Sequence, residues 1–230
     1  KRYSFKKIFM NKKIIAFIPA RGGSKSIKNK NLKKIGTKNL IEITIDQALK
    51  SKLFSKTILS SDSNRILKVG KKYKKIERLK RSPSISKDTS KTEPAILNYF
   101  KNNLNYSEEY LVILQVTSPL RKIKTLKNFI SHCISKKLKN CLTVTHKKDH
   151  ISKYQNFFDP LEKVNIRRRQ DRKGFLIENG MIYFLNIKEF LKRKTIYSKK
   201  WNYFITEEYE SIDINNIKDL EIIKKIYKNV

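Results

Sequence analysis

The stretch KIIAFIPARGGSKSIKNKN, residues 13–31, decides the fold of this chain. It opens with a continuous apolar run, Ile14 to Ile18, which is typical of a strand buried on both faces of a parallel sheet. The pair Gly22–Gly23 follows, and glycine permits a positive φ and a close approach of the backbone to a ligand. Main-chain N–H groups in such a turn can converge on an anion, with Arg21 and Lys25 adding positive charge. The stretch therefore predicts a buried strand followed by a loop that holds a polyphosphate.

Two familiar phosphate-binding spacings are absent from this loop. Neither GxxxxGK[ST] nor GxGxxG occurs in residues 13–31. The alternative is an ordinary turn after a strand, carrying solvated lysines. It stays open on these residues alone because the whole chain is rich in lysine.

Apolar runs and helical periodicities alternate along the rest of the chain. The expected strands are 57–60, 76–79, 110–116, 141–145 and 180–185, and the expected helices are 39–51, 63–72, 93–99, 122–137, 187–194 and 216–228. Thr92 is a candidate N-cap, residues 81–88 and 146–174 are expected to be irregular, and Ser211 to Ile214 is expected to be short and extended. This order predicts an α/β fold, with a mostly parallel Rossmann-like sheet and helices on both faces.

The charge of the chain is strongly positive. Lys and Arg number 54 against 20 Asp and Glu, a net charge of +34, which suits nucleic acid, an anionic surface or anionic substrates. The lysines are spread along the chain, and together with abundant Ile and Asn they resemble the bias of an AT-rich genome. Because no interleaving of aromatic and basic residues is present, nucleic-acid binding is the weaker interpretation.

Length and composition favour one domain, residues 12–230, after a flexible basic extension, residues 1–11. The 39% hydrophobic content can supply a full core. No apolar run has membrane-spanning length, and residues 1–9 lack the apolar centre and cleavage site of a signal peptide. Met10 is a plausible true start, and we expect a cytoplasmic protein. Cys133 and Cys141 have no metal-binding spacing, so we expect core thiols.

Ligands of open α/β sheets bind beyond the carboxyl ends of the strands. Polar residues follow the expected strands at Arg21 to Lys25, Ser61–Asp62, Gln115 to Arg121 and Asp213. Basic groups with one or two carboxylates suit a nucleoside triphosphate and a divalent metal ion.

Six short segments of the chain are distinctive. The first is IPARGGSK, residues 18–25, with Lys30–Asn31 after it. The others, in order, are RSPSISKD (81–88), LQVTSPLR (114–121), RQD (169–171), NGMIY (179–183) and SIDI (211–214). Together they resemble the motifs of the CMP-sialic acid synthetase family, the cytidylyltransferases that make CMP-activated nonulosonates. The resemblance covers residues 12–228, nearly the whole chain.

This resemblance implies a nucleotidyltransferase fold of the glycosyltransferase-A-like type. It also implies transfer of CMP from CTP to the anomeric hydroxyl of a nonulosonic acid, with release of pyrophosphate. The implied nucleotide-binding residues are Arg21, Gly22, Gly23, Ser24, Lys25, Lys30, Asn31 and Arg81. The implied acceptor-binding residues are Gln115, Arg169, Tyr183 and Lys153. Asp213 and Asn215 are the implied Mg²⁺ ligands, the expected catalytic residues are Arg21, Lys25 and Asp213, and residues 146–174 would form a homodimer contact.

The chain departs from the family pattern at several positions. Asn215 replaces a second aspartate, and Mg²⁺ prefers carboxylates. Ser26 stands in place of glycine, Val116 and Asn39 each in place of proline, and Ile196 where an aromatic residue is expected in the sugar pocket. These departures suggest shifted acceptor specificity or reduced activity.

Simpler roles stay open for several candidates. Gln115 could cap a strand end, Tyr183 could be plain core, and Arg121 could only position its loop. Asp213 could support the helix 216–228 through the helix dipole, and Arg169 could lie in a solvated loop. The alternative functions are transfer to another acid sugar such as KDO, an inactive relative, or a basic nucleic-acid-binding protein.

Overall fold

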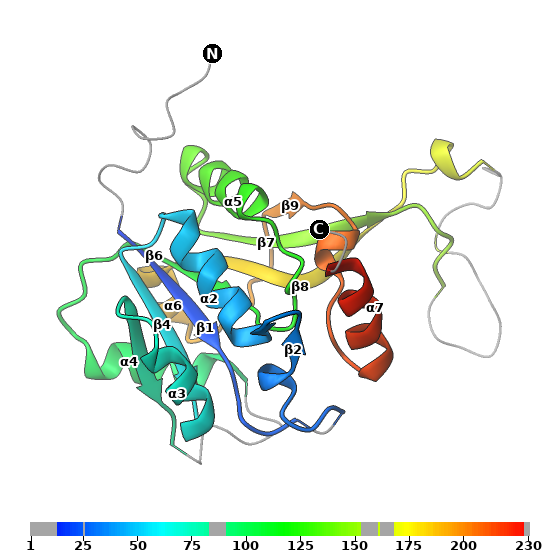
Figure 1. Ribbon diagram of the computed structural model, residues 1–230. Coiled ribbons are helices and arrows are strands. Elements are labelled where there is room, and N and C mark those ends of the chain that lie inside the picture. The colour runs from blue at the N-terminus through cyan, green and yellow to red at the C-terminus, as the bar shows by residue number, and fades with distance from the viewer. Residues whose placement is uncertain (1–12, 25, 83–90, 153–160, 162–167, 228–230) are drawn as a thin grey trace.

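A seven-stranded sheet forms the centre of the computed structural model, which describes residues 13–24, 26–82, 91–152, 161 and 168–227 (Figure 1). The strands are β1 (Ile14–Pro19), β4 (Lys56–Ser61), β5 (Ile76–Lys80), β6 (Tyr110–Leu114), β7 (Asn140–Lys147), β8 (Phe175–Asn186) and β9 (Tyr203–Ile205). Their order is β5-β4-β1-β6-β8-β7-β9, and β8 alone runs against the others. The predicted, mostly parallel sheet is therefore confirmed.

Helices cover both faces of this sheet, as predicted. They are α2 (Leu40–Ser51), α3 (Asn64–Lys71), α4 (Glu93–Asn102), α5 (Ile123–Ser135), α6 (Ile187–Arg193) and α7 (Ile217–Tyr227). Ile14, Ala16 and Ile18 of β1 pack on the face with α2, α3, α5 and α7, whereas Ile15 and Phe17 pack on the face with α4 and α6. All five side chains are fully buried. This two-sided burial explains why the run has no polar alternation.

A capping box starts α2 at a position where the family motif has proline. The Asn39 side chain accepts a hydrogen bond from the Glu42 backbone N–H, and the Glu42 carboxylate accepts one from the Asn39 N–H, both 2.9 Å long. These two bonds satisfy backbone donors that the helix itself leaves unpaired. Thr92, by contrast, makes no capping bond, and α4 begins with a proline in its first turn.

Short elements were not predicted from the sequence. They are β2 (Lys34–Ile35), β3 (Lys38–Asn39) and the 3-10 helices η1 (Lys30–Leu32), η3 (Arg169–Asp171) and η4 (Tyr209–Ser211). The three-residue strand β9 was also missed. Elements of two or three residues are shorter than the periods that identify strands and helices. Ser211 ends η4, so the expectation of an extended segment from Ser211 is wrong at its first residue.

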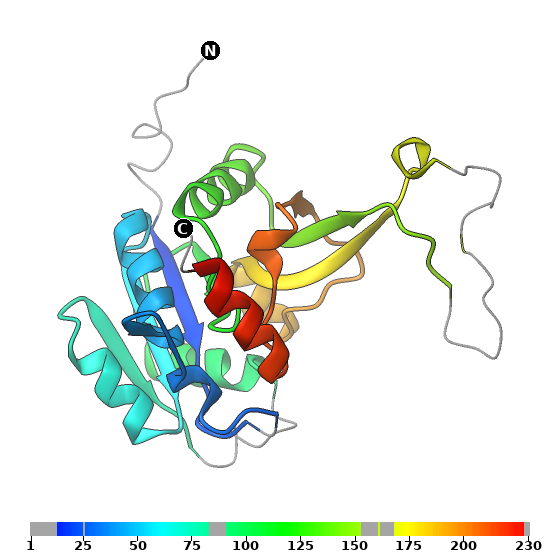
Figure 2. The same cartoon turned by 45° about the vertical axis from the view of Figure 1, so that its right-hand side comes forward.

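The strands β7 and β8 continue beyond the sheet as a two-stranded ribbon that projects from the body (Figures 1 and 2). Strand β8 starts at Phe175, five residues before the expected start at Gly180. The register shifts between Leu142 and Val144, which marks an irregularity where the ribbon leaves the body. The start of β8 was missed because Phe175 to Ile177 form only a short apolar run, which Glu178 and Asn179 separate from the buried run that follows Gly180.

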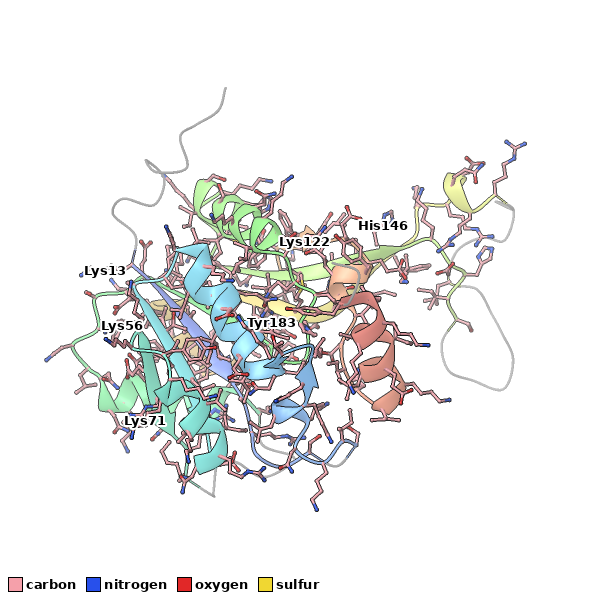
Figure 3. The ribbon with its side chains drawn as sticks, viewed as in Figure 1. Lys13, Lys56, Lys71, Lys122, His146 and Tyr183 are labelled. Atoms are coloured by element: carbon pink, nitrogen blue, oxygen red, sulfur yellow. The ribbon has the colours of Figure 1, made fainter. Side chains whose placement is uncertain are left out.

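Three predictions from composition can be compared with the described residues. Lysine side chains, including Lys13, Lys56, Lys71 and Lys122, project from separate parts of the molecule (Figure 3), in keeping with a charge spread over the chain. Cys133 and Cys141 are both buried and unbridged, as expected. Within the described ranges, no helix is long and apolar enough to span a bilayer. The expected extension, residues 1–11, lies outside the described part.

Candidate active site

A cavity of about 250 Å³ lies at the carboxyl end of β1 and β6. It brings together residues from five separate stretches of the chain. Its lining consists of Pro19, Arg21, Gly23, Ser24, Lys30, Asn31, Arg81, Lys91, Thr92, Gln115, Val116, Thr117 and Asp213. Most of the predicted nucleotide-binding residues therefore line one cavity, at the sheet edge where the topology places ligands.

The loop after β1 is packed against the end of β4. The Gly22 N–H donates to the Asp62 carboxylate over 2.8 Å, and a Cβ atom at Gly22 would lie only 2.7 Å from the Cβ of Ser63. Gly22 has no positive φ, whereas Gly36, Gly174 and Gly180 do. The expected positive φ is therefore wrong for Gly22, which is instead required for the close approach to Ser63, while its approach to a ligand stays a prediction.

Two further bonds shape the loop around the cavity. The Asn31 side-chain amide donates to the Arg21 carbonyl over 2.9 Å. Lys30 Nζ donates to the Ile214 carbonyl over 2.8 Å, and this bond joins the loop to the segment that carries Asp213. Burial lowers the pKa of Lys30, the nearby Asp213 opposes that shift, and Arg21 adds to it. The cavity thus holds cationic groups close enough to affect one another, which suits a polyanionic ligand.

Arg81 is a buried cation at the edge of this cavity. Its Nε donates to Ser60 Oγ over 2.9 Å and its Nη2 to the Ser60 carbonyl over 3.0 Å. Burial lowers the pKa of Arg81 to about 10, Asp62 opposes this shift, and Arg21 contributes to it. The guanidinium is therefore held rigidly at the end of β4, with positive charge directed to the cavity rim.

Gln115 lines the cavity, and its backbone is held by Arg121. Arg121 is 2% exposed, and its guanidinium donates to the carbonyls of Gln115 (3.2 Å) and Met181 (3.0 Å). A further Arg121 bond of 2.8 Å goes to Gln47 Oε1, and Gln47 in turn donates to the Pro119 and Arg121 carbonyls. The interpretation of Arg121 as a residue that positions its loop is supported.

Asp213 lies on the cavity wall, with one carboxylate oxygen 3.5 Å from Ser118 Oγ. The helix that follows is capped by other residues. Asp219 accepts from the N–H groups of Asn215 (2.8 Å) and Asn216 (2.9 Å), and Asn216 Oδ1 accepts from the Asp219 N–H. The hydrogen bonds that cap this helix therefore come from Asn216 and Asp219, whereas support by Asp213 through the helix dipole stays an open alternative.

A second, more open cavity of about 570 Å³ also contains Asp213. Its other lining residues come from the ribbon and the segment before α7: Thr145, Lys147, Ile177, Glu178, Asn179, Gly180, Glu208, Ser211, Ile212 and Asn215. Asp213 thus lies between two cavities, the first rich in cations and the second rich in carboxylates and amides. Such an arrangement can hold two substrates on either side of one carboxylate.

The sequence profile described as cytidylyltransferase matches residues 15–229. The chain is 30% identical to the pseudaminic acid cytidylyltransferase of Campylobacter jejuni, an alignment covering 94% of this chain and 97% of that protein. This chain belongs to the cytidylyltransferase family. It is also 30% identical to the N-acylneuraminate cytidylyltransferase of Streptococcus agalactiae, over 90% of this chain and 51% of that protein.

A solved structure of CMP:2-keto-3-deoxy-manno-octonic acid synthetase complexed with CTP has the same fold as this cytidylyltransferase. The TM-score is 0.68 at 13% identity, with 94% of this chain and 99% of the other covered. At that identity the similarity concerns the fold alone. It confirms the predicted α/β nucleotidyltransferase type.

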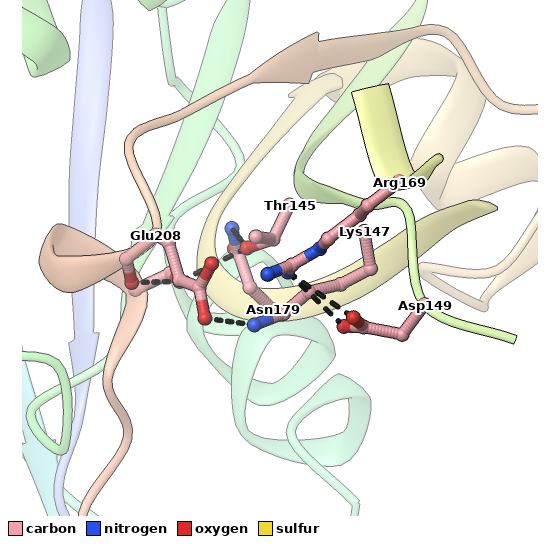
Figure 4. A network of polar contacts seen from close by, with 7 residues as sticks. Thr145, Lys147, Asp149, Arg169, Asn179 and Glu208 are labelled. Atoms are coloured by element: carbon pink, nitrogen blue, oxygen red, sulfur yellow. Dashed lines mark hydrogen bonds and ion pairs between the residues drawn. The ribbon is translucent and has the colours of Figure 1, made fainter. Parts of the chain in front are cut away.

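Two further predicted residues of this cytidylyltransferase, Tyr183 and Arg169, are not part of the lining of the first cavity. Tyr183 is buried in the core, where Figure 3 labels it, and its hydroxyl donates to Glu178 over 2.5 Å. Burial and Glu178 raise the pKa of Tyr183. Arg169 lies in η3, 3.1 Å from the Asp149 carboxylate (Figure 4). Lys25 and Lys153 lie outside the described residues.

The side chains at this site suit a metal ion that binds together with a substrate. In the described part of the chain, no three Asp, Glu, His or Cys side chains gather to hold an ion. Mg²⁺ is commonly held by one or two carboxylates together with substrate phosphates and water. Asp213 can supply one carboxylate beside the cationic cavity, and the exposed Asn215 lines the second cavity.

Two features of the site were not assigned a role from the sequence. Lys91 and Thr92 line the first cavity, although Thr92 was expected only as a cap. Asn179 forms a partly buried hydrogen-bond network with three threonines. A threonine-rich strand such as β7 has no pattern that would identify these partners in advance.

Proposed function

We propose that this cytidylyltransferase transfers CMP from CTP to the anomeric hydroxyl of a nonulosonic acid and releases pyrophosphate. The position of Asp213 between a cationic cavity and a second, polar cavity carries the proposal. The names of the relatives supply the substrate class, since both act on nonulosonic acids.

CTP would bind in the first cavity, with its phosphates near the loop that follows β1. Arg21 and Lys30 line that cavity and neutralise phosphate charge, and Arg81 holds further positive charge at its rim. Such charge–phosphate contacts are stronger than neutral hydrogen bonds. Ser24, Gly23 and Asn31 add polar surface on the same wall.

The reaction is an in-line displacement at phosphorus. The anomeric oxygen of the sugar acid forms a bond to the α-phosphorus while the bond to the bridging oxygen breaks, and pyrophosphate leaves with that electron pair. The hydroxyl proton passes to solvent. Catalysis of this kind depends on positioning and charge neutralisation. Gln115 orients the acceptor, while Arg21, and by resemblance Lys25, stabilise charge on the departing pyrophosphate.

Asp213 would hold Mg²⁺, together with Asn215 two residues further along the chain. When bound, this ion neutralises triphosphate charge. The family resemblance further suggests a homodimer in which the segment of residues 146–174 brings Lys153 and Arg169 to the partner's site. A cytoplasmic location, where CTP is present, completes the proposal.

The experiment is pyrophosphate release from CTP by purified protein with Mg²⁺ and a panel of sialic, legionaminic and pseudaminic acids. KDO is included, because turnover with KDO alone would identify the alternative acceptor class. Arg21→Ala is expected to abolish turnover while the circular dichroism spectrum is retained. Lys33→Ala, an exposed cation outside the cavity, is the matched control and should keep full activity. Absence of turnover with every acceptor would reject the proposal.

A further inference from the structure

Asn179 lies at the centre of a partly buried polar network between β7, β8 and the segment after β9 (Figure 4). Its amide oxygen accepts from Thr143 Oγ1 over 2.7 Å and from the Met181 N–H over 3.2 Å. Its amide nitrogen donates to Thr145 Oγ1 over 3.1 Å and to Thr206 Oγ1 over 2.9 Å. All four hydrogen-bonding positions of the side chain are used, so its orientation is fully determined.

The network continues from Asn179 toward Asp213 in one direction. Thr145 Oγ1 lies 2.9 Å from Ser211 Oγ, and Ser211 Oγ donates to the Glu208 carbonyl over 2.7 Å. Because a serine hydroxyl has a single hydrogen, Ser211 must accept from Thr145. Asn179, Thr145 and Ser211 thus form a relay of aligned hydrogen bonds, which ends two residues before Asp213.

The segment on the other side of Asp213 is also held. The Ile214 N–H donates to the Thr117 carbonyl over 3.0 Å, and the Ile214 carbonyl accepts from Lys30 Nζ. Ile214 itself is fully buried. The backbone at Asp213 is therefore restrained from both sides, by the core after it and by the relay before it.

We infer that Asn179 is a positioning residue that sets the Asp213 carboxylate through Thr145 and Ser211. This inference rests on the proposed function, in which Asp213 binds the metal ion of the CTP complex. A break in the relay leaves buried polar atoms without partners and releases the segment from Glu208 to Ile212. Metal binding should then weaken, because a displaced carboxylate no longer meets the ion and the triphosphate together.

The test uses Thr145→Val, which removes the relay hydroxyl and keeps the side-chain shape, and Thr145→Ser, which retains the hydroxyl. Binding of Mn²⁺ in the presence of CTP, without any acceptor, is measured by electron paramagnetic resonance. Thr145→Val and Asn179→Ala should each weaken Mn²⁺ binding about tenfold or more, because each interrupts the relay. Thr145→Ser should restore binding close to that of the unmodified protein.

A matched control is Thr44→Val in α2. Thr44 is also buried and donates to the Leu40 carbonyl over 3.0 Å, outside the relay. It should lower the melting temperature without changing Mn²⁺ binding. If Thr145→Val fails to fold, Ser211→Ala at the half-buried end of the relay replaces it, with the same expected weakening.

Two failures can be told apart. Unaltered Mn²⁺ binding by a folded Thr145→Val or Ser211→Ala protein would overturn the relay alone. Absence of CTP-dependent Mn²⁺ binding in the unmodified protein would instead reject the proposed metal role of Asp213.

Discussion

Lys30 Nζ donates a hydrogen bond of 2.8 Å to the carbonyl oxygen of Ile214, a residue 184 positions further along the chain. The bond joins the loop after the first strand to the segment before the last helix. It places a cation of the triphosphate cavity next to the residue that follows Asp213. Two segments that are distant in the sequence thus build one site. Substitutions at Lys30 should therefore affect both the loop after the first strand and the proposed metal ligand Asp213.

Lys30→Ala should weaken CTP binding about tenfold to a hundredfold, since it removes a cavity cation and a charge-assisted hydrogen bond. Isothermal titration with CTP measures the effect. Lys28→Ala changes an exposed cation of the same loop and should bind CTP normally. Normal binding by Lys30→Ala would contradict the assignment.

The affinity for CTP should also fall as the pH rises into the alkaline range. Because burial lowers the pKa of Lys30, its positive charge is lost as pH rises at values below 10.5, the ordinary pKa of lysine. The protonated form attracts phosphate, so CTP affinity should fall over that range. Lys30→Arg keeps its charge there and should flatten this part of the profile. CTP titrations at a series of pH values up to 10.5 compare the unmodified protein with Lys30→Arg. Identical pH profiles of the two proteins would contradict the role of Lys30.

Gly22→Ala should destabilise the protein by about 1–3 kcal/mol, the usual cost of overpacking. The added Cβ would lie 2.7 Å from the Cβ of Ser63. Ser63→Gly removes the opposing atom, so the double variant should recover most of the loss. Urea denaturation measures both. Equal instability of the single and double variants would show that the contact is not the cause.

Asn215→Asp should strengthen metal binding. It adds a second carboxylate two residues after Asp213, and ligand charge tunes the affinity of such sites, so the Mg²⁺ concentration for half-maximal activity should fall about tenfold. Asn102→Asp makes the same charge change on an exposed position of α4 and should leave that concentration unaltered. An unaltered or higher Mg²⁺ requirement for Asn215→Asp would contradict the ligand role.

Arg121→Lys should lower the free energy of unfolding by about 3 kcal/mol, because it breaks a buried network and leaves carbonyls unpaired. Lysine lacks the planar fork that reaches Gln115, Met181 and Gln47 together. The neighbouring exposed Lys122→Ala should change stability little. Urea unfolding curves compare the two, and a small effect at Arg121 would reject its positioning role.

Much of the fold followed from local pattern. The unbroken apolar run of β1 predicted burial on two faces, and the alternation of strands and helices predicted a mostly parallel sheet. Motif resemblance also predicted that Arg21, Lys30, Arg81, Gln115 and Asp213 belong to one site, and they line one cavity. The strand β9 was missed because it has only three residues, which are too few to show a period. Two of them, Tyr203 and Ile205, are also half-exposed.

The sequence alone determined which segments are buried, approximately where the helices begin and which family the motifs resemble, because burial leaves a periodic pattern within a few residues. Tertiary structure decided that β8 reverses direction, that Gly22 is required by its approach to Ser63, and that Asn179 reaches Ser211 through Thr145. These relationships join residues that are far apart in the chain. They depend on strand order and packing, which no local pattern records.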